Sequence, residues 1–306
     1  MEKRQLGTSD LYVSKLGLGC MSLGKDEHQA TTIIDAAVDQ GINYLDTADL
    51  YDFGLNEEFV GKAIKEKRND LILATKVGNK WNKDKDGWSW DPSKSYIKKA
   101  VKDSLQRLQT DYIDLYQLHG GTIEDNIDET IEAFEDLKKE GVIRYYGISS
   151  IRPNVIREYV EKSSIVSVMM QYSILDRRPE ETVMPLLQEN KISIVARGPV
   201  GKGLLTNKGM KKFKESFNEK GYLDYSSNEL SQLLPELQRL HTHESLNATA
   251  LHYCLHSPVV ASVIAGASSM QQLKENVEAI NQSTLTDEEY KAIQVLSKSL
   301  TYTSHR

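Results

Sequence analysis

Short runs of apolar and β-branched residues recur along the chain, and longer segments between them repeat apolar residues every three to four positions. The short runs have the length and composition of buried strands, whereas the longer segments have the period of amphipathic helices. Eight short runs lie at residues 16–20, 42–46, 71–76, 113–119, 142–149, 166–171, 192–196 and 259–266.

The longer segments carry the end signals of helices. The segment at 28–41 ends on Gly41 and the segment at 130–141 ends on Gly141, and glycine is the residue that most readily closes a helix. The segment at 96–109 places several side chains on one face, namely Ile97, Val101, Ser104, Leu105 and Leu108.

Strand and helix alternating in this way predict an α/β fold with a parallel sheet. Eight strands are the number that closes a (β/α)8 TIM barrel. A doubly wound open sheet is the alternative, and it calls for a glycine-rich dinucleotide fingerprint after an early strand. The nearest candidate has Gly17, Gly19 and Gly24, and its last glycine comes two positions late. The barrel is therefore favoured.

Residues 2–15 do not fit the repeat. They contain two short extended pieces around a Gly-Thr-Ser-Asp turn, which predicts a β-hairpin that closes one barrel end. No Pro-rich or Ser-rich linker interrupts the chain, so residues 1–306 are expected to form a single domain. Two connections are long, at 78–95 and 206–229.

Composition narrows the class of protein. Hydrophobic residues make up 39% and charged residues 27%, as in a globular protein with a sizeable core. The net charge of -6 argues against nucleic-acid binding. Cys20 and Cys254 are too few for a disulfide framework, and no apolar run reaches the length of a signal peptide core or a membrane span. A cytoplasmic location without membrane contact is expected, whereas the oligomeric state is left open.

Polar residues that end strands are the candidates for chemistry, because the strand ends of a barrel converge on its active face. Asp46 ends the second run, Lys76 the third and His119 the fourth, and Tyr51 lies just beyond Asp46. Asp46 can keep a buried Lys76 charged, and an ammonium beside a phenol is expected to lower the pKa of Tyr51. A tyrosine tuned in this way can act as a general acid, and His119 can orient a carbonyl oxygen.

The chain offers no nucleophile elbow and no metal-ligand spacing, which points to a bound hydride donor. A nicotinamide dinucleotide needs its phosphates held. The glycine-rich segments at 196–206 and 265–276 suit this role, since the first contains Lys202 and the second places Ser268 and Ser269 before a helix N-terminus.

Over essentially its whole length the sequence resembles the aldo-keto reductases. Their Asp, Tyr, Lys and His tetrad matches Asp46 in LDTADLY, Tyr51, Lys76 in ATK and His119 in YQLH. The resemblance implies reduction of a small aldehyde or ketone with NADPH, on a barrel with an N-terminal hairpin. It also implies cofactor contacts in GISS, GPVGKGLLT and GASSMQQLKEN, at Ser149, Ser150, Gly198, Pro199, Val200, Lys202, Gly203, Leu204, Gly266, Ser268, Gln272, Glu275 and Asn276.

The chain departs from the family pattern around the nicotinamide. Ser150 stands where the family commonly has Asn, Met169 where it has Gln, and Arg197 where an aromatic stacks on the ring. Gln171 lies two residues from Met169, hence on the same strand face, and could bind the carboxamide. An arginine cation against the ring is expected to weaken NADP+ relative to NADPH.

Several alternatives stay open. A barrel aldolase could use Lys76 as a Schiff base, and some family members act as NADPH-binding regulatory subunits with little turnover. Trp81, Trp88 and Trp90 either anchor their loop or wall an apolar substrate pocket. The lysine-rich run at 211–220 is typical of a solvated helix face, although a lid over the cofactor also fits. His241 and His243 are expected to face solvent.

Overall fold

Eight parallel strands close into a barrel in the computed structural model, which describes residues 1–240 and 245–306. His241 and His243 lie outside the described residues. The strands pair in the closed order β10-β11-β12-β3-β4-β5-β8-β9. Their bounds are β3 (Leu16–Gly19), β4 (Tyr44–Asp46), β5 (Ile72–Val77), β8 (Ile113–Leu118), β9 (Ile143–Ser149), β10 (Ser167–Gln171), β11 (Ser193–Arg197) and β12 (Val260–Gly266).

Each barrel strand coincides with one of the eight predicted runs, so the predicted (β/α)8 fold is confirmed. The ends differ by one or two residues. β4 begins only at Tyr44, because Asn43 is occupied by hydrogen bonds to the N-terminal hairpin. Cys20 no longer belongs to β3 and begins a short 3-10 turn.

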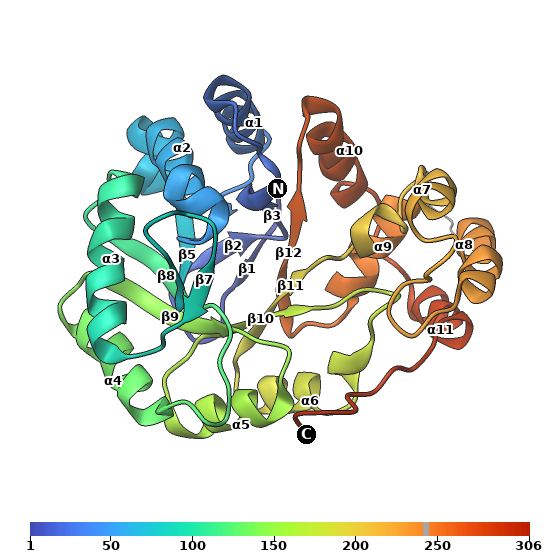
Figure 1. The fold of residues 1–306 in the computed structure, drawn as a ribbon. Coiled ribbons are helices and arrows are strands. Elements are labelled where there is room, and N and C mark those ends of the chain that lie inside the picture. Colours follow the sequence, from blue (N-terminus) through green and yellow to red (C-terminus); the bar gives the residue numbers. More distant parts are fainter. Residues whose placement is uncertain (241–244) are drawn as a thin grey trace.

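Helices surround the barrel (Figure 1). α3 buries Ile97, Val101 and Leu108 as the pattern predicts, and the Ser93 side chain caps its first turn. The helices are α1 (Glu27–Asp39), α2 (Leu55–Ile64), α3 (Lys94–Leu108), α4 (Ile127–Lys139), α5 (Pro153–Lys162), α6 (Val183–Glu189), α7 (Gly209–Ser216), α8 (Ser227–Leu240), α9 (Leu246–His256), α10 (Met270–Ile280) and α11 (Asp287–Leu296).

The N-terminal hairpin of β1 (Lys3–Gln5) and β2 (Tyr12–Ser14) closes one end of the barrel, as predicted. Leu6 and Val13 pack into the barrel interior. Gly7 has φ +58° and approaches the Val166 carbonyl so closely that a Cβ would lie 2.2 Å from its oxygen. Arg4 donates hydrogen bonds to three carbonyls at the end of α9 and the start of β12. The hairpin is therefore docked by both apolar and polar contacts.

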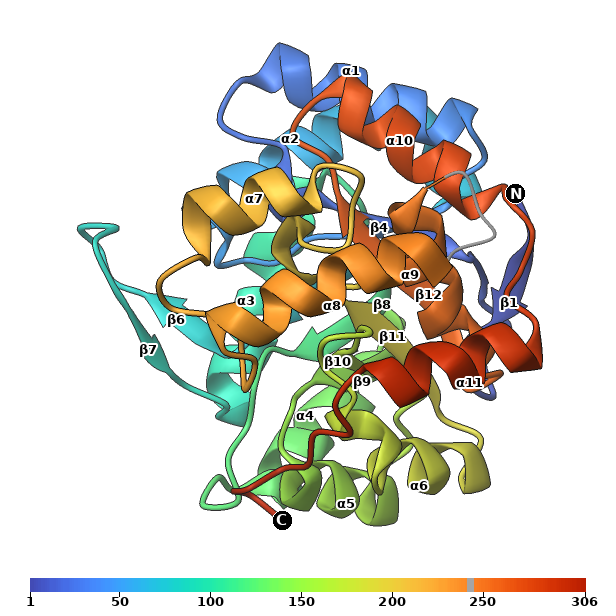
Figure 2. The ribbon, with the colours of Figure 1, turned by 90° about the vertical axis from the view of Figure 1, so that its right-hand side faces the viewer.

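The two long connections have structure of their own. The first forms a hairpin of β6 (Asn79–Trp81) and β7 (Trp88–Trp90), which lies at the opposite end of the molecule from β1 and β2 (Figure 2). The second contains α7, where Phe213 is buried, and Phe217 directly after the helix is buried as well. α7 is therefore amphipathic, with Lys211, Lys212 and Lys214 of the lysine-rich run exposed to solvent.

Candidate active site

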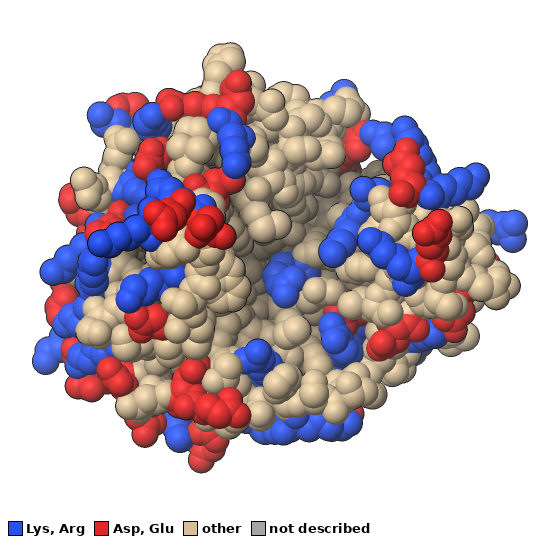
Figure 3. Space-filling model, viewed as in Figure 1, with Lys and Arg blue, Asp and Glu red and all other residues tan. Residues whose placement is uncertain are grey.

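A cleft of about 980 Å³ opens at the end of the barrel where the strands finish. Figure 3 shows this face hollowed at its centre, with Lys and Arg side chains within and beside the hollow. Most residues predicted for the site line the cleft, namely Asp46, Tyr51, Lys76, His119, Ser149, Ser150, Gln171, Arg197, Gly198, Pro199, Val200, Lys202 and Gly266.

Lys76 lies at the base of the cleft and is almost fully buried. Its Nζ donates hydrogen bonds to Asp46 Oδ2 at 2.8 Å, to the Thr47 carbonyl at 2.8 Å and to Tyr51 Oη at 3.3 Å. Burial works against the ammonium, but the charges of Asp46 and Tyr51 raise the pKa of Lys76 overall. A Schiff base needs the neutral amine, and a raised pKa favours the ammonium, so this environment disfavours the aldolase alternative.

Tyr51 reaches Lys76 through the turn that follows Asp46, in which the Tyr51 amide donates to the Ala48 carbonyl. Asp52 and Phe53 both adopt positive φ angles, of 47° and 53°, in a short turn that leads into α2. Burial raises the pKa of Tyr51 above its usual value, and the Lys76 charge opposes this shift without reversing it. The expected net lowering of the Tyr51 pKa is therefore wrong, because desolvation of the phenolate outweighs the attraction to the ammonium.

His119 lies beside Tyr51 at the end of β8, with the two rings 5.9 Å apart and nearly perpendicular. Burial lowers the pKa of His119 to about 3, and the charges of Lys76 and Arg197 add to the effect. The imidazole is thus neutral at neutral pH and can donate one N–H to a ligand oxygen. Its Nδ1 has no hydrogen-bond partner among the described residues.

A buried charge network that no local sequence pattern indicates supports the base of the cleft. Glu57 on α2 accepts hydrogen bonds from Thr75 Oγ1 at 2.5 Å and from Arg107 Nε at 2.7 Å. Thr75 directly precedes Lys76, so the network fixes the strand that carries the lysine. Asp49 is buried nearby, and desolvation together with the Glu57 charge raises its pKa well above the usual range.

The predicted nicotinamide region gathers at the ends of β9, β10 and β11. Gln171 and Met169 both line the cleft, as the strand period of two requires. Arg197 is exposed, and its Nη1 donates to Gln171 Oε1 at 3.2 Å. The Ser150 amide donates to the Met169 carbonyl.

The predicted phosphate turn has the backbone of an anion cradle. Gly198, Gly201, Lys202 and Gly203 all have positive φ angles, between 53° and 90°, and successive residues of this kind can present N–H groups to one side. These residues fit a dinucleotide phosphate. The Leu204 side chain instead packs in the hydrophobic core, so only its backbone is available to a ligand.

Residues predicted near the adenosine phosphate lie around the N-terminus of α10. Ser268 donates through both its amide and its hydroxyl to Gln272 Oε1. Glu275 is bound by Lys208 at 3.0 Å. Asn276 is largely buried. Its side-chain amide donates to the Gly266 carbonyl and accepts a hydrogen bond from the side chain of Asn247. Ser268 and Gln272 remain exposed beside the helix N-terminus, where an anion is favoured.

The tryptophan loop serves both of the roles considered for it. Trp88 and Trp90 line the cleft. Trp81 instead packs on Phe53 and beneath the Arg107 guanidinium, which anchors the hairpin to the barrel. Further lining residues were not anticipated from the sequence, namely Met21, Ser22, Leu50, Asn79, Thr122, Ile151, Arg152 and Tyr222.

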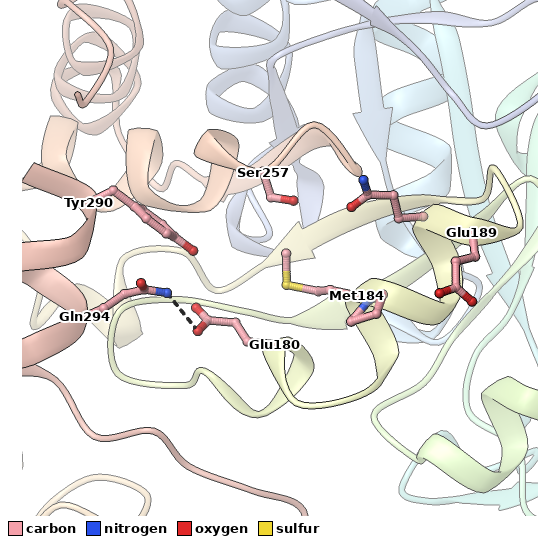
Figure 4. Close-up of a pocket in the computed structure, with 8 residues that line it drawn as sticks. Glu180, Met184, Glu189, Ser257, Tyr290 and Gln294 are labelled. Atoms are coloured by element: carbon pink, nitrogen blue, oxygen red, sulfur yellow. Dashed lines mark hydrogen bonds between the residues drawn. The ribbon is translucent and has the colours of Figure 1, made fainter. Parts of the chain in front are cut away.

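A second hollow lies on the outer wall and shares no lining residue with the cleft (Figure 4). Its central carboxylate, Glu180, accepts hydrogen bonds from Tyr172, Arg177, Tyr253 and Gln294. These contacts join the short turn at 178–180 to α9 and α11, so Glu180 is part of the packing between these elements. The barrel mouth is therefore the candidate active site.

Within 1–240 and 245–306, no cluster of three or more His, Cys, Asp or Glu side chains could hold a metal ion. In the same ranges, no helix combines the length and the apolar character that crossing a membrane requires.

The barrel, its hairpin and the buried Lys76–Asp46 pair beside Tyr51 define a class of barrel oxidoreductases. The family model described as Aldo/keto reductase family matches residues 15–298. The chain therefore belongs to the aldo-keto reductase family.

Individual relatives agree with this assignment. The chain is 62% identical to an uncharacterized oxidoreductase of Bacillus subtilis (strain 168), YqkF, over 306 residues that cover both chains fully. It is 32% identical to the NADH-specific methylglyoxal reductase of Escherichia coli (strain K12), with 92% of this chain and 94% of the relative covered. The holo form of aldo-keto reductase AKR11C1 from Bacillus halodurans matches with a TM-score of 0.95 and 62% identity, over 100% of this chain and 99% of that one.

Proposed function

We propose that this protein reduces an aldehyde or a ketone to an alcohol with NADPH, and that Tyr51 is the general acid. The observation that carries the proposal is the contact of Lys76 Nζ with both Asp46 and Tyr51 at the base of an open cleft. A phenol beside a fixed ammonium can release its proton to a developing alkoxide, because the phenolate that remains is stabilised by the charge.

Each of the four side chains has its own part in this scheme. Tyr51 stays protonated until the substrate oxygen gains charge, since burial disfavours the phenolate. Asp46 holds Lys76 in the charged form. His119, as a neutral imidazole, donates a hydrogen bond that orients the carbonyl oxygen. When bound, the reduced nicotinamide supplies the hydride to the carbonyl carbon.

The cofactor is assigned to the strand ends that border this centre. Ser149, Ser150 and Gln171 would bind the carboxamide, and Arg197 would cover the ring. The turn at 198–204 would hold the pyrophosphate. The adenosine phosphate is assigned to the start of α10, with Gly266, Ser268, Gln272, Glu275 and Asn276.

Preference for NADPH over NADH is part of the proposal. Exposed hydroxyl and amide groups at the N-terminus of α10, on Ser268 and Gln272, favour an added 2′-phosphate. One relative is named as specific for NADH, so the preference must be measured. We also assign the reaction to the cytoplasm, which suits the two free cysteines, Cys20 and Cys254.

A cofactor oxidation assay tests the proposal. The protein is mixed with NADPH or NADH and a panel of aldehydes, ketones and dicarbonyls, and the loss of reduced cofactor is followed. Turnover with NADPH at a higher kcat/KM than with NADH is expected. Tight NADPH binding with negligible turnover on every carbonyl would instead favour a regulatory subunit, an alternative to which the oxidoreductase relatives give no support.

A further inference from the structure

The exposed charge of the cleft is entirely positive, although the chain as a whole carries -6. Five charged residues line it, and Asp46 and Lys76 neutralise each other. The other three are Arg152, Arg197 and Lys202, and none of them forms an ion pair with any carboxylate in the described ranges. Unpaired cations around one cleft favour anionic ligands.

Two of these cations lie where the proposed cofactor would bind. Lys202 belongs to the phosphate turn, and Arg197 contacts Gln171 beside the nicotinamide region. Arg152 differs from both, because its Nη1 donates to the carbonyl of Gly121. Gly121 follows His119 by two residues. The Arg152 guanidinium therefore contacts the segment that directly follows the imidazole proposed to orient the substrate.

Trp90 also contacts this segment. A Cβ on Gly120 would lie 3.3 Å from the Trp90 ring, so the indole packs directly on this glycine. Trp90 Nε1 donates to the Asp125 carboxylate at 2.9 Å, and Asp125 accepts the Thr122 amide at 2.7 Å. Residues 120–125 are therefore held by the Trp90 indole, which contacts Gly120 and Asp125, and by the Arg152 guanidinium, which contacts Gly121.

The rim around this segment is apolar. Met21, Trp88 and Ile151 line the cleft while 64%, 57% and 37% of their surface is exposed. Large exposed apolar side chains that gather at one opening favour a ligand with an apolar body. Within residues 1–240 and 245–306, the Arg152 guanidinium makes one hydrogen bond, to the Gly121 carbonyl, so most of its five N–H donors are available to a ligand.

We propose that Arg152 binds a carboxylate on the substrate, so that the preferred substrates are aldehydes or ketones with an apolar body and a carboxylate at the far end. A single guanidinium fork matches a carboxylate bidentately. This inference rests on the proposed reductase function and adds a substrate class to it. Arg152 contacts the substrate away from the reacting carbonyl, so it determines specificity.

The test compares 3- and 4-carboxybenzaldehyde with their methyl esters in the native protein and in Arg152→Gln. Glutamine retains an N–H that can bond the Gly121 carbonyl while it removes the charge. In Arg152→Gln, the KM for at least one of the two acids should rise about tenfold while kcat stays nearly unchanged. This is the size of effect that loss of a charge-assisted hydrogen bond produces. Both esters should keep their kcat/KM.

Controls separate this role from others. Arg157→Gln removes an exposed charge from α5, the helix that directly follows Arg152, outside the cleft, and should leave every substrate unaffected. Arg152→Lys should recover part of the lost affinity for the acid. Equal losses on acids and esters, or a changed Kd for NADPH, would overturn the inference. Ester turnover by the native protein reports the proposed reductase function separately, so a failure of that function is recognised by itself.

Discussion

The Lys76 ammonium lies 3.3 Å from the phenol oxygen of Tyr51, although 25 residues separate them in the chain. The contact exists because β4 and β5 are neighbours in the barrel and the turn after Asp46 folds Tyr51 back over the lysine. Both groups are largely desolvated, so each charge strongly influences the other. The predictions below follow from this coupling and from the surroundings that maintain it.

The Lys76–Asp46 pair should contribute strongly to stability. Lys76→Met leaves a buried carboxylate without its counter-charge and should lower the free energy of unfolding by about 3 to 5 kcal/mol. The double variant with Asp46→Asn should lose much less than the sum of the single variants, because neither charge is then stranded. Urea denaturation measures both.

The exposed pair Lys62–Glu27 is the matched control, and Lys62→Met should cost no more than about 1 kcal/mol. Additive losses in the double variant would show that Lys76 and Asp46 are not coupled.

The pH profile of kcat/KM for reduction should show no inflection caused by His119. His119 has a pKa near 3, so it does not change charge above about pH 5. Tyr51 acts in its protonated form, and a raised pKa extends that form to higher pH. The kcat/KM for a neutral aldehyde should therefore be flat from about pH 5 to 9 and fall only in more alkaline solution. An inflection near neutrality that disappears in His119→Gln would be inconsistent with a neutral imidazole.

Arg197 should discriminate between the two oxidation states of the cofactor. The oxidised ring is cationic and the reduced ring is neutral, so a guanidinium beside it repels only NADP+. Arg197→Gln should raise the affinity for NADP+ relative to NADPH by roughly three- to tenfold, the modest size reflecting solvent exposure. Fluorescence titration gives both Kd values. Lys202→Gln is the control and should weaken the binding of NADP+ and NADPH equally. An unchanged ratio of the two Kd values in Arg197→Gln would refute the idea.

Gly7→Ala should release the hairpin that closes the barrel. The added Cβ would lie 2.2 Å from the Val166 oxygen in a backbone with φ +58°, so a loss of about 2 to 4 kcal/mol is expected by thermal or urea unfolding. Gly24 also has a positive φ but has nothing near its would-be Cβ, and Gly24→Ala should lose only about 1 kcal/mol. Equal effects at the two positions would mean that the close contact is unimportant.

The architecture was readable from the sequence because strand and helix leave different apolar periods, and each predicted run became a barrel strand. The convergence of Asp46, Lys76 and His119 followed as well, since the strand ends of a barrel meet on one face. The structure adds the distances, which no one-dimensional pattern contains.

Effects that depend on burial were harder to predict from the sequence. The expected direction of the Tyr51 pKa shift was wrong. Burial raises this pKa and the Lys76 charge lowers it, and the balance depends on how fully water is excluded. The Glu57–Arg107 pair joins residues that are 50 positions apart on two helices. Arg152 became a candidate for substrate binding only through its contact with Gly121. Its place three residues after a predicted strand end was the one signal that could have indicated Arg152.

The central claim is that Tyr51 delivers the proton that accompanies hydride transfer. The most direct measurement is the single-turnover rate of NADPH oxidation by Tyr51→Phe with a neutral aldehyde, beside Tyr222→Phe, which removes a phenol from the same cleft. The account predicts a rate at least about a hundredfold lower for Tyr51→Phe, with the Kd of NADPH nearly unchanged and Tyr222→Phe close to native. A Tyr51→Phe variant that transfers hydride at the native rate would contradict it.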